Sequence, residues 1–185
     1  LELFSSFKKF RFEAGLNVNH PIEFWEESIK SIKKLQSVGL KIYNQNPLLK
    51  DVNDDFTTLV ELYSKLRKND IEAHYLFHAI PMVGTNHHRT SLKTGYDLTS
   101  KLSSCGLFSG RSKPKYAVLS DIGKIVIYED TIVKKRSEDN SLLLKSGFNY
   151  DERLKWNPSW VKPQSVEIAK DGTMYTWYLD GDDKR

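Results

Sequence analysis

Residues 73–79 read AHYLFHA, a run that is almost wholly apolar or aromatic. Such a run is typical of a parallel strand that is covered on both faces, because a strand with one face in water would alternate polar and apolar residues. Parallel strands need long crossover connections, which are usually helices. The run therefore predicts an α/β architecture.

Helix and strand patterns alternate over the first 130 residues, in the manner of βα units. A short helix over residues 1–10 is followed by predicted strands at 12–19, 40–44 and 73–79. The predicted helices begin at Pro21, at Asp54 or Asp55, and at Thr90 or Ser91. Gly39 ends the first of them, and residues 46–53 are expected to form a loop. Open parallel sheets normally continue or close into a barrel, so the pattern predicts part of a larger α/β barrel.

The pattern changes beyond Gly110. Short strands are predicted at 116–119 and 124–127, and the charged stretch 134–141 (KKRSEDNS) is predicted to be a solvated loop. Residues 165–179 hold an Asp171-Gly172 turn between apolar runs, which predicts a β-hairpin. We therefore expect a barrel portion over residues 1–130 and a β-rich tail over residues 131–185.

Composition narrows the possible functions. The net charge of +4 comes from 28 basic and 24 acidic residues that are interspersed, so the sequence does not favour nucleic-acid binding. No apolar run approaches 18 residues and no signal peptide is visible, so we expect no membrane span. The single cysteine, Cys105, excludes an internal disulfide and indicates a reducing compartment, the cytoplasm. It also excludes a cysteine-ligated cluster within the chain, and the histidines are not spaced as a metal site.

Four sequence blocks occur in an order that is found in a known family. They are NVNHPIEFWEES (17–28), NQNPLLKDVND (44–54), HYLFHAIPMVGTNHHRTSLKTGYDL (74–98) and CGLFSGRSKPKYAVLSDIGKI (105–125). Together they resemble the C-terminal portion of the lysine 2,3-aminomutase family, whose members are radical S-adenosylmethionine (SAM) enzymes that depend on pyridoxal phosphate (PLP). The resemblance implies the C-terminal part of a partial radical SAM (β/α) barrel. It also implies an isomerase that moves an amino group between adjacent carbons through a 5′-deoxyadenosyl radical.

The resemblance gives Lys124 its most important role. Lys124 matches the lysine that forms the internal aldimine with PLP, a reaction that needs an uncharged primary amine. The alternative is a surface lysine at the start of a strand. The family's glycine run is reduced here to Ile122-Gly123, so the resemblance leaves open whether PLP still binds.

Further binding residues are implied in the same way. Gln45, beside Asn44, matches a glutamine that contacts SAM, and its alternative role is to form hydrogen bonds at a strand end. His20, His87 and Arg89 match the family's NHP and HFRT motifs, where an arginine serves a phosphate or carboxylate. For the histidines, structural hydrogen bonding is the alternative role.

The substrate positions depart from the family. Two aspartates that bind the side-chain ammonium of lysine correspond here to Ile80 and Leu119. An ammonium group buried against aliphatic side chains would lack hydrogen-bond partners. We therefore expect an amino-acid substrate other than lysine, unless Asp121 supplies the missing carboxylate.

The family's CxxxCxxC motif, which holds a [4Fe–4S] cluster, does not occur in these 185 residues. We therefore expect this chain alone to be inactive, and PLP to be its own cofactor, with SAM and the cluster belonging to the intact parent. Excision from a longer protein, whose N-terminal half is a partner, is the favoured explanation, and a homo-oligomer is possible. Other hypotheses are a PLP-binding protein without radical chemistry and a non-catalytic module. The module would bind an anion or a partner through Arg89, Arg111, Lys113 and Lys115.

Overall fold

A computed structural model of the chain describes residues 1–7 and 9–183. Across these residues the chain forms two β-sheets. The first sheet has the strand order β1-β2-β3-β4-β5, in which β1 to β4 are parallel and β5 is antiparallel to β4. Its strands are β1 (Glu13–Leu16), β2 (Lys41–Leu48), β3 (Glu72–His78), β4 (Lys115–Ser120) and β5 (Gly123–Val126).

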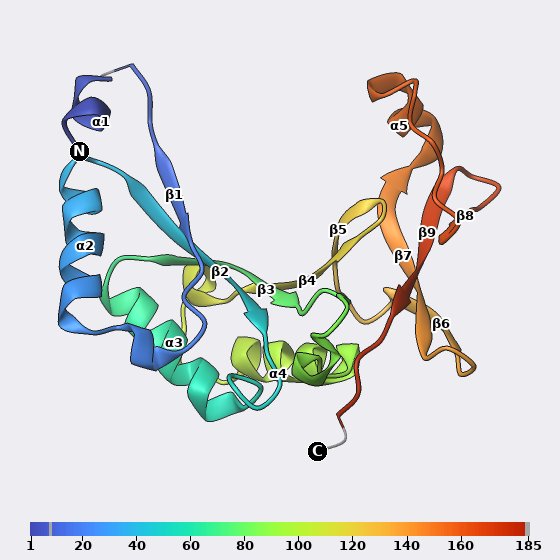
Figure 1. Cartoon of the computed structure of the whole chain (residues 1–185), viewed down its shortest axis with the longest axis horizontal. Helices are drawn as coiled ribbons and strands as arrows, with labels where there is room; N and C mark the ends of the chain where they lie inside the picture. The colour runs from blue at the N-terminus through green and yellow to red at the C-terminus, as the bar shows by residue number, and fades with distance from the viewer. Residues whose placement is uncertain (8, 184–185) are drawn as a thin grey trace.

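Helices connect the parallel strands and lie on one side of the first sheet, which leaves its other face uncovered (Figure 1). The chain begins with α1 (Glu2–Ser6), and the three connecting helices are α2 (Glu26–Ser37), α3 (Phe56–Lys68) and α4 (Leu92–Ser104). The Asp55 carboxylate caps α3 by accepting a hydrogen bond from the Thr58 amide, and the Ser91 hydroxyl caps α4 at the Thr94 amide. Three short 3-10 helices also occur among the described residues: η1 (Pro21–Glu23), η2 (Asn86–His88) and η3 (Gly110–Ser112).

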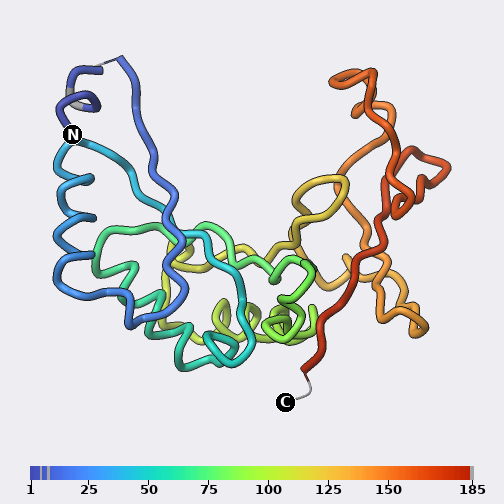
Figure 2. Tube along the Cα trace, viewed as in Figure 1, coloured from blue at the N-terminus to red at the C-terminus, as the bar shows by residue number. Residues whose placement is uncertain are grey.

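The second sheet is antiparallel, with the strand order β6-β7-β9-β8. It is built from β6 (Ile132–Arg136), β7 (Ser141–Asn149), β8 (Val166–Ile168) and β9 (Thr173–Leu179), and α5 (Tyr150–Trp156) follows β7. This sheet lies at the opposite end of the molecule from α1 and α2, as the chain trace also shows (Figure 2).

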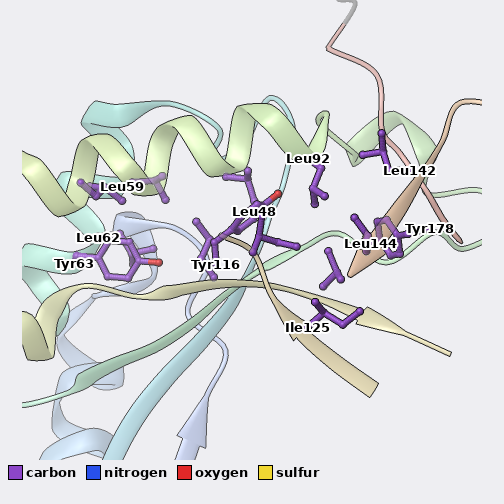
Figure 3. Packing of buried hydrophobic residues seen from close by; sticks show 14 of the residues in the cluster. Leu48, Leu59, Leu62, Tyr63, Leu92, Tyr116, Ile125, Leu142, Leu144 and Tyr178 are labelled. Carbon is purple, nitrogen blue, oxygen red and sulfur yellow. The ribbon is translucent and has the colours of Figure 1, made fainter. Parts of the chain in front are cut away.

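One apolar core runs through both sheets (Figure 3). Between the first sheet and its helices, Leu48 packs with Leu59 and Leu92, all of which are fully buried. The same cluster continues into the second sheet through Leu144 and Tyr178. Full burial of one such leucine stabilises the fold by about 1.5–3 kcal/mol, so the two sheets are joined by substantial apolar contact.

The predicted α/β class is present in the structure, which also has a separate antiparallel sheet, while the partial barrel stays a prediction. The hairpin over residues 165–179 is confirmed, because Val166 pairs with Thr176 across it. Three predictions were wrong in detail. The helix predicted from Pro21 is instead η1 followed by α2. Strand β2 extends into the expected loop as far as Leu48, and residues 134–136 of the expected loop belong to β6.

Candidate functional site

The uncovered face of the first sheet carries aromatic and polar side chains from β2, β3 and β5. Strand alternation separates it from the buried face, because Ile42, Asn44, Asn46 and Leu48 of β2 are buried against the helices while the residues between them are half-buried. We call this surface the open face. It consists of Tyr43, Gln45, Tyr75, Phe77, Leu119 and Lys124, which the strand register places on one side.

Lys124 lies on the open face near the carboxyl ends of the parallel strands. It is the register partner of Leu119 in β4. Its Nζ lies 4.0 Å from the centroid of the Tyr75 ring and 5.2 Å from that of Phe77. A cation over the face of an aromatic ring is attracted by the ring quadrupole. The amine is therefore held against β3, although the residue as a whole is exposed.

A β-bulge brings a histidine onto the same surface. The register between β2 and β3 shifts so that Asn44 pairs with Ala73 and Gln45 with Tyr75, which leaves His74 as the extra residue. The His74 ring contacts the ring of Tyr43 at 5.1 Å and that of Tyr75 at 4.2 Å. Burial lowers the pKa of the imidazole, and the charge of Lys124 lowers it further. His74 is therefore neutral near pH 7 and can donate or accept a hydrogen bond.

A cleft of about 390 Å³ opens beside Lys124, between the two sheets. Lys124 and Val126 of β5 line one side of it, and Lys145 and Gly147 of β7 line the other. Asp130 contributes one carboxylate to the wall. The cleft therefore combines two amines with apolar surface, a combination that suits a flat ligand carrying negative charge.

The structure brings Gln45 and Lys124 to the open face but places Asn44 and His20 elsewhere. The Asn44 amide is buried on the helix side, where it exchanges hydrogen bonds with the Val18 backbone at 2.8 and 3.0 Å. His20 caps η1, with its Nδ1 accepting from the Ile22 amide at 3.2 Å. His20 therefore makes the structural hydrogen bond that was its alternative to ligand binding, and the Asn44 side chain is likewise bonded to the backbone.

Arg89 is 1% exposed, and its guanidinium points at backbone carbonyls. Nε donates to the Ala79 carbonyl at 2.9 Å, Nη1 to that of Asp180 at 3.1 Å and Nη2 to that of Leu179 at 2.5 Å. These bonds tie the end of β3 to the end of β9. His87 is exposed in η2, where its ring lies 4.0 Å from that of His88.

The positions expected to select the substrate are apolar or already bonded. Ile80 follows β3 and is 40% exposed, while Leu119 is 37% exposed on the open face beside Lys124. The Asp121 carboxylate accepts a hydrogen bond from the Ser165 hydroxyl. This bond directs the carboxylate toward the second sheet.

The four cations of the proposed anion-binding module do not converge. Arg89 is buried near the carboxyl ends of the strands, whereas Arg111 pairs with Glu72 near the amino end of β3. Lys113 Nζ donates to the Ser103 carbonyl at 2.6 Å, and Lys115 begins β4. The arrangement therefore gives no support to a single anion surface made of these residues.

Sequence reasoning overlooked Tyr43 and Tyr75 as site residues. It considered His74 only as a metal ligand and rejected that role. The alternation of aromatic residues in HYLFH places Tyr75 and Phe77 on one face, and this pattern could have identified them. The bulge that turns His74 toward Tyr43 has no comparable signal in the sequence. Among residues 1–7 and 9–183, no group of three potential metal ligands occurs, and none of the helices is long and apolar enough to span a membrane.

Comparison with known proteins places these residues in context. No family model matches the chain. An Aquifex aeolicus protein provisionally named an L-lysine 2,3-aminomutase is 34% identical over 122 residues, which is 64% of this chain and 32% of the relative. The L-lysine 2,3-aminomutase of Clostridium subterminale is 33% identical over 119 residues (63% and 28%), and that of Methanococcus maripaludis is 34% identical over 100 residues (54% and 23%). The match thus spans about a third or less of each relative's length.

Proposed function

The chain corresponds to a C-terminal portion of the lysine 2,3-aminomutase family, and from this we propose that its open face is the PLP-binding side of a radical SAM aminomutase. The observation that carries the proposal is the position of Lys124, whose amine lies against Tyr75 on the open face and whose residue also lines the inter-sheet cleft. We propose further that the first sheet is part of the family's barrel. The enzyme would work in a reducing compartment such as the cytoplasm.

The residues around Lys124 fit PLP chemically. The cofactor needs an accessible amine, a flat apolar surface and positive charge for its phosphate. Lys124 supplies the amine, Phe77 lies beside that amine on the open face, and Lys145 lines the adjoining cleft. When bound, PLP lets the amino group of a substrate be held covalently and stabilises a neighbouring radical. In this chain Lys124 would anchor the cofactor, and Tyr75 with Phe77 would support its ring.

Gln45 is the residue we propose for contact with SAM. It is half-buried on the open face and is the register partner of Tyr75, so it stands one strand away from the ring that holds Lys124. The cysteines that ligate the family's cluster would have to come from outside these 185 residues, which contain only Cys105. The radical step is therefore a proposal for a longer protein.

A substrate other than lysine is expected, although the relatives' names specify L-lysine. Ile80 and Leu119 offer no counter-charge, and burying an unpaired ammonium beside them would cost several kcal/mol. An enzyme that contains this chain should therefore turn over an amino acid with an apolar side chain faster than lysine. The measurement is product formation from a panel of amino acids at equal concentration. A clear preference for lysine would contradict this proposal.

Titration of the chain with PLP tests the proposed cofactor site. We expect the absorbance band of a lysine–PLP adduct to grow with saturation in the wild-type chain and to be lost in Lys124→Gln. Lys170→Gln is the matched control, because Lys170 is an exposed lysine in the turn between β8 and β9. Equal bands in all three proteins would show that Lys124 is an ordinary surface lysine, and the proposed function would fail.

A further inference from the structure

The direction in which Lys124 projects is set by the turn that precedes it. Strands β4 and β5 form a hairpin in which Ser120 pairs with Gly123, so that Asp121 and Ile122 are the two loop residues. Ile122 is buried in the core at 1% exposure, and Gly123 has a φ of 119°. This backbone conformation strains residues other than glycine. Lys124 is the residue that follows Gly123, so a shift of the turn would also move its amine.

Arg153 of α5 holds this turn from the side of the second sheet. Its Nη2 donates to the Ile122 carbonyl at 2.5 Å. Its guanidinium also lies over two aromatic rings, 5.1 Å from the centroid of Phe148 and 5.0 Å from that of Trp160. Among the described residues Arg153 makes no ion pair, so its hydrogen bond to the turn is not in competition with a carboxylate.

Two further contacts join the second sheet to the same turn. The Phe148 ring lies against Gly123, where an added Cβ would be 3.3 Å from the ring. The Ser165 hydroxyl donates to the Asp121 carboxylate. The loop residues Asp121 and Ile122, and Gly123 after them, therefore each contact a residue of the second sheet or its connections, and Lys124 follows immediately.

We propose that Arg153 is a positioning residue for Lys124, and that the C-terminal sheet serves the site by fixing the 121–123 turn. This inference rests on the proposed function, because it concerns the reactivity of Lys124 toward PLP. A planar guanidinium can lie between two rings and still donate to a carbonyl, whereas an ammonium on a flexible stem cannot do both equally well. Arg153 therefore acts through the backbone and does not need to touch the cofactor.

The test compares labelling of two lysines within one molecule. The chain is treated with PLP and borohydride, and peptide mass analysis gives the ratio of pyridoxyl label at Lys124 to label at Lys170. In Arg153→Gln we expect this ratio to fall roughly tenfold to a hundredfold, the loss that a misplacement of about 1 Å can cause. Arg153→Lys should recover part of it. A purely structural role would shift the unfolding temperature without changing a ratio measured inside the folded molecule.

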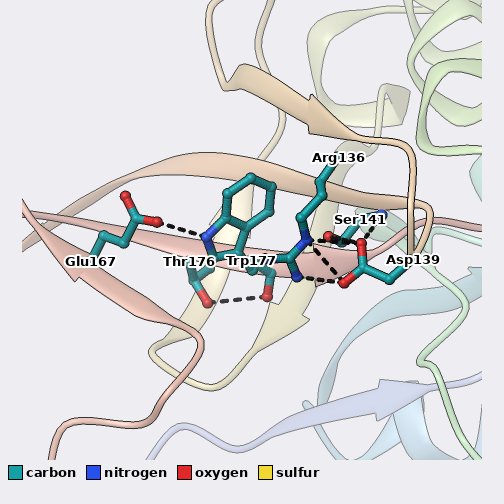
Figure 4. Close-up of polar contacts among 6 residues, drawn as sticks. All are labelled: Arg136, Asp139, Ser141, Glu167, Thr176 and Trp177. Carbon is teal, nitrogen blue, oxygen red and sulfur yellow. Dashed lines mark hydrogen bonds and ion pairs between the residues drawn. The ribbon is translucent and has the colours of Figure 1, made fainter.

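Arg136→Gln is the matched control. Arg136 also stacks on an aromatic ring of the second sheet, 4.3 Å from the Trp177 centroid, but it pairs with Asp139 and does not contact the turn (Figure 4). We expect this variant to keep the wild-type ratio. If Arg153→Gln fails to fold, Trp160→Leu removes one stacking ring and should lower the ratio in the same direction.

The outcomes separate this inference from the proposed function. An unchanged ratio in folded Arg153→Gln, or in Trp160→Leu where the first variant does not fold, would overturn the positioning role. A wild-type chain with no preference for Lys124 over Lys170 would instead overturn the proposed PLP site. A fall in the ratio with Arg153→Gln alone, and not with Arg136→Gln, supports the inference.

Discussion

At the residue scale, the buried side chains of His78 and Arg89 are held by specific hydrogen-bond partners. His78 is fully buried, and its Nε2 lies 2.8 Å from the Thr90 carbonyl while its Nδ1 lies 2.8 Å from the Tyr178 hydroxyl. Because a carbonyl can only accept, Nε2 carries the proton and Nδ1 accepts from the tyrosine. His78 therefore links the end of β3 both to the start of α4 and to β9, as a neutral imidazole.

His78 predicts a dependence of stability on pH. Burial lowers its pKa to about 4 from an ordinary value of 6.5, so the unfolded chain binds the proton more tightly than the folded one. The contribution is fully present above about pH 6.5 and is lost as the pH falls toward 4, by on the order of 3 kcal/mol. Burial lowers the pKa of His74 as well, which acts in the same direction.

The measurement is the free energy of unfolding at several pH values between 7 and 4. We expect a steeper fall in the wild-type chain than in His78→Gln, whose side chain does not titrate. His87→Gln, a change at an exposed position, should follow the wild-type curve. Parallel curves for the wild-type chain and His78→Gln would show that this histidine does not carry the effect.

At the element scale, local sequence patterns predicted the positions of strands and helices. They did not predict the long-range contacts that fix the ends of these elements. The cap at Asp55, the strand through Leu76 and the hairpin around Gly172 followed from local patterns, because propensity, capping and turn chemistry are short-range. The bonds from Arg89 to Leu179 and Asp180 span about 90 residues of sequence. No local pattern encodes such a contact, so the structural role of Arg89 could not be predicted from the sequence. The role that the motif resemblance implied for Arg89 was anion binding.

Substitution of Arg89 separates its two roles. A lysine cannot reach the carbonyls of Ala79, Leu179 and Asp180 together, and each carbonyl left buried without a partner costs about 1–3 kcal/mol. We expect Arg89→Lys to lower the free energy of unfolding by roughly 2–5 kcal/mol in urea titrations. Arg111→Lys, at an exposed arginine, should change it by less than about 0.5 kcal/mol. Unchanged stability in Arg89→Lys, together with weaker PLP binding, would support the phosphate-binding role instead.

At the scale of the whole molecule, two sheets share one core, and their junction forms the cleft beside Lys124. The sequence indicated both parts, because the alternation of the first gives way to short strands in the second. It could not indicate how they meet, since the contact of Phe148 with Gly123 depends on tertiary packing. The resemblance pointed to Lys124 and Gln45, and the packing around them adds Tyr75 and Arg153.

The most direct test of the central claim is to identify which lysine carries the cofactor. The wild-type chain is incubated with substoichiometric PLP, fixed with borohydride, digested and analysed by mass spectrometry. We predict that the pyridoxyl group is found mainly on Lys124. Label distributed over the surface lysines without an excess at Lys124 would contradict the account.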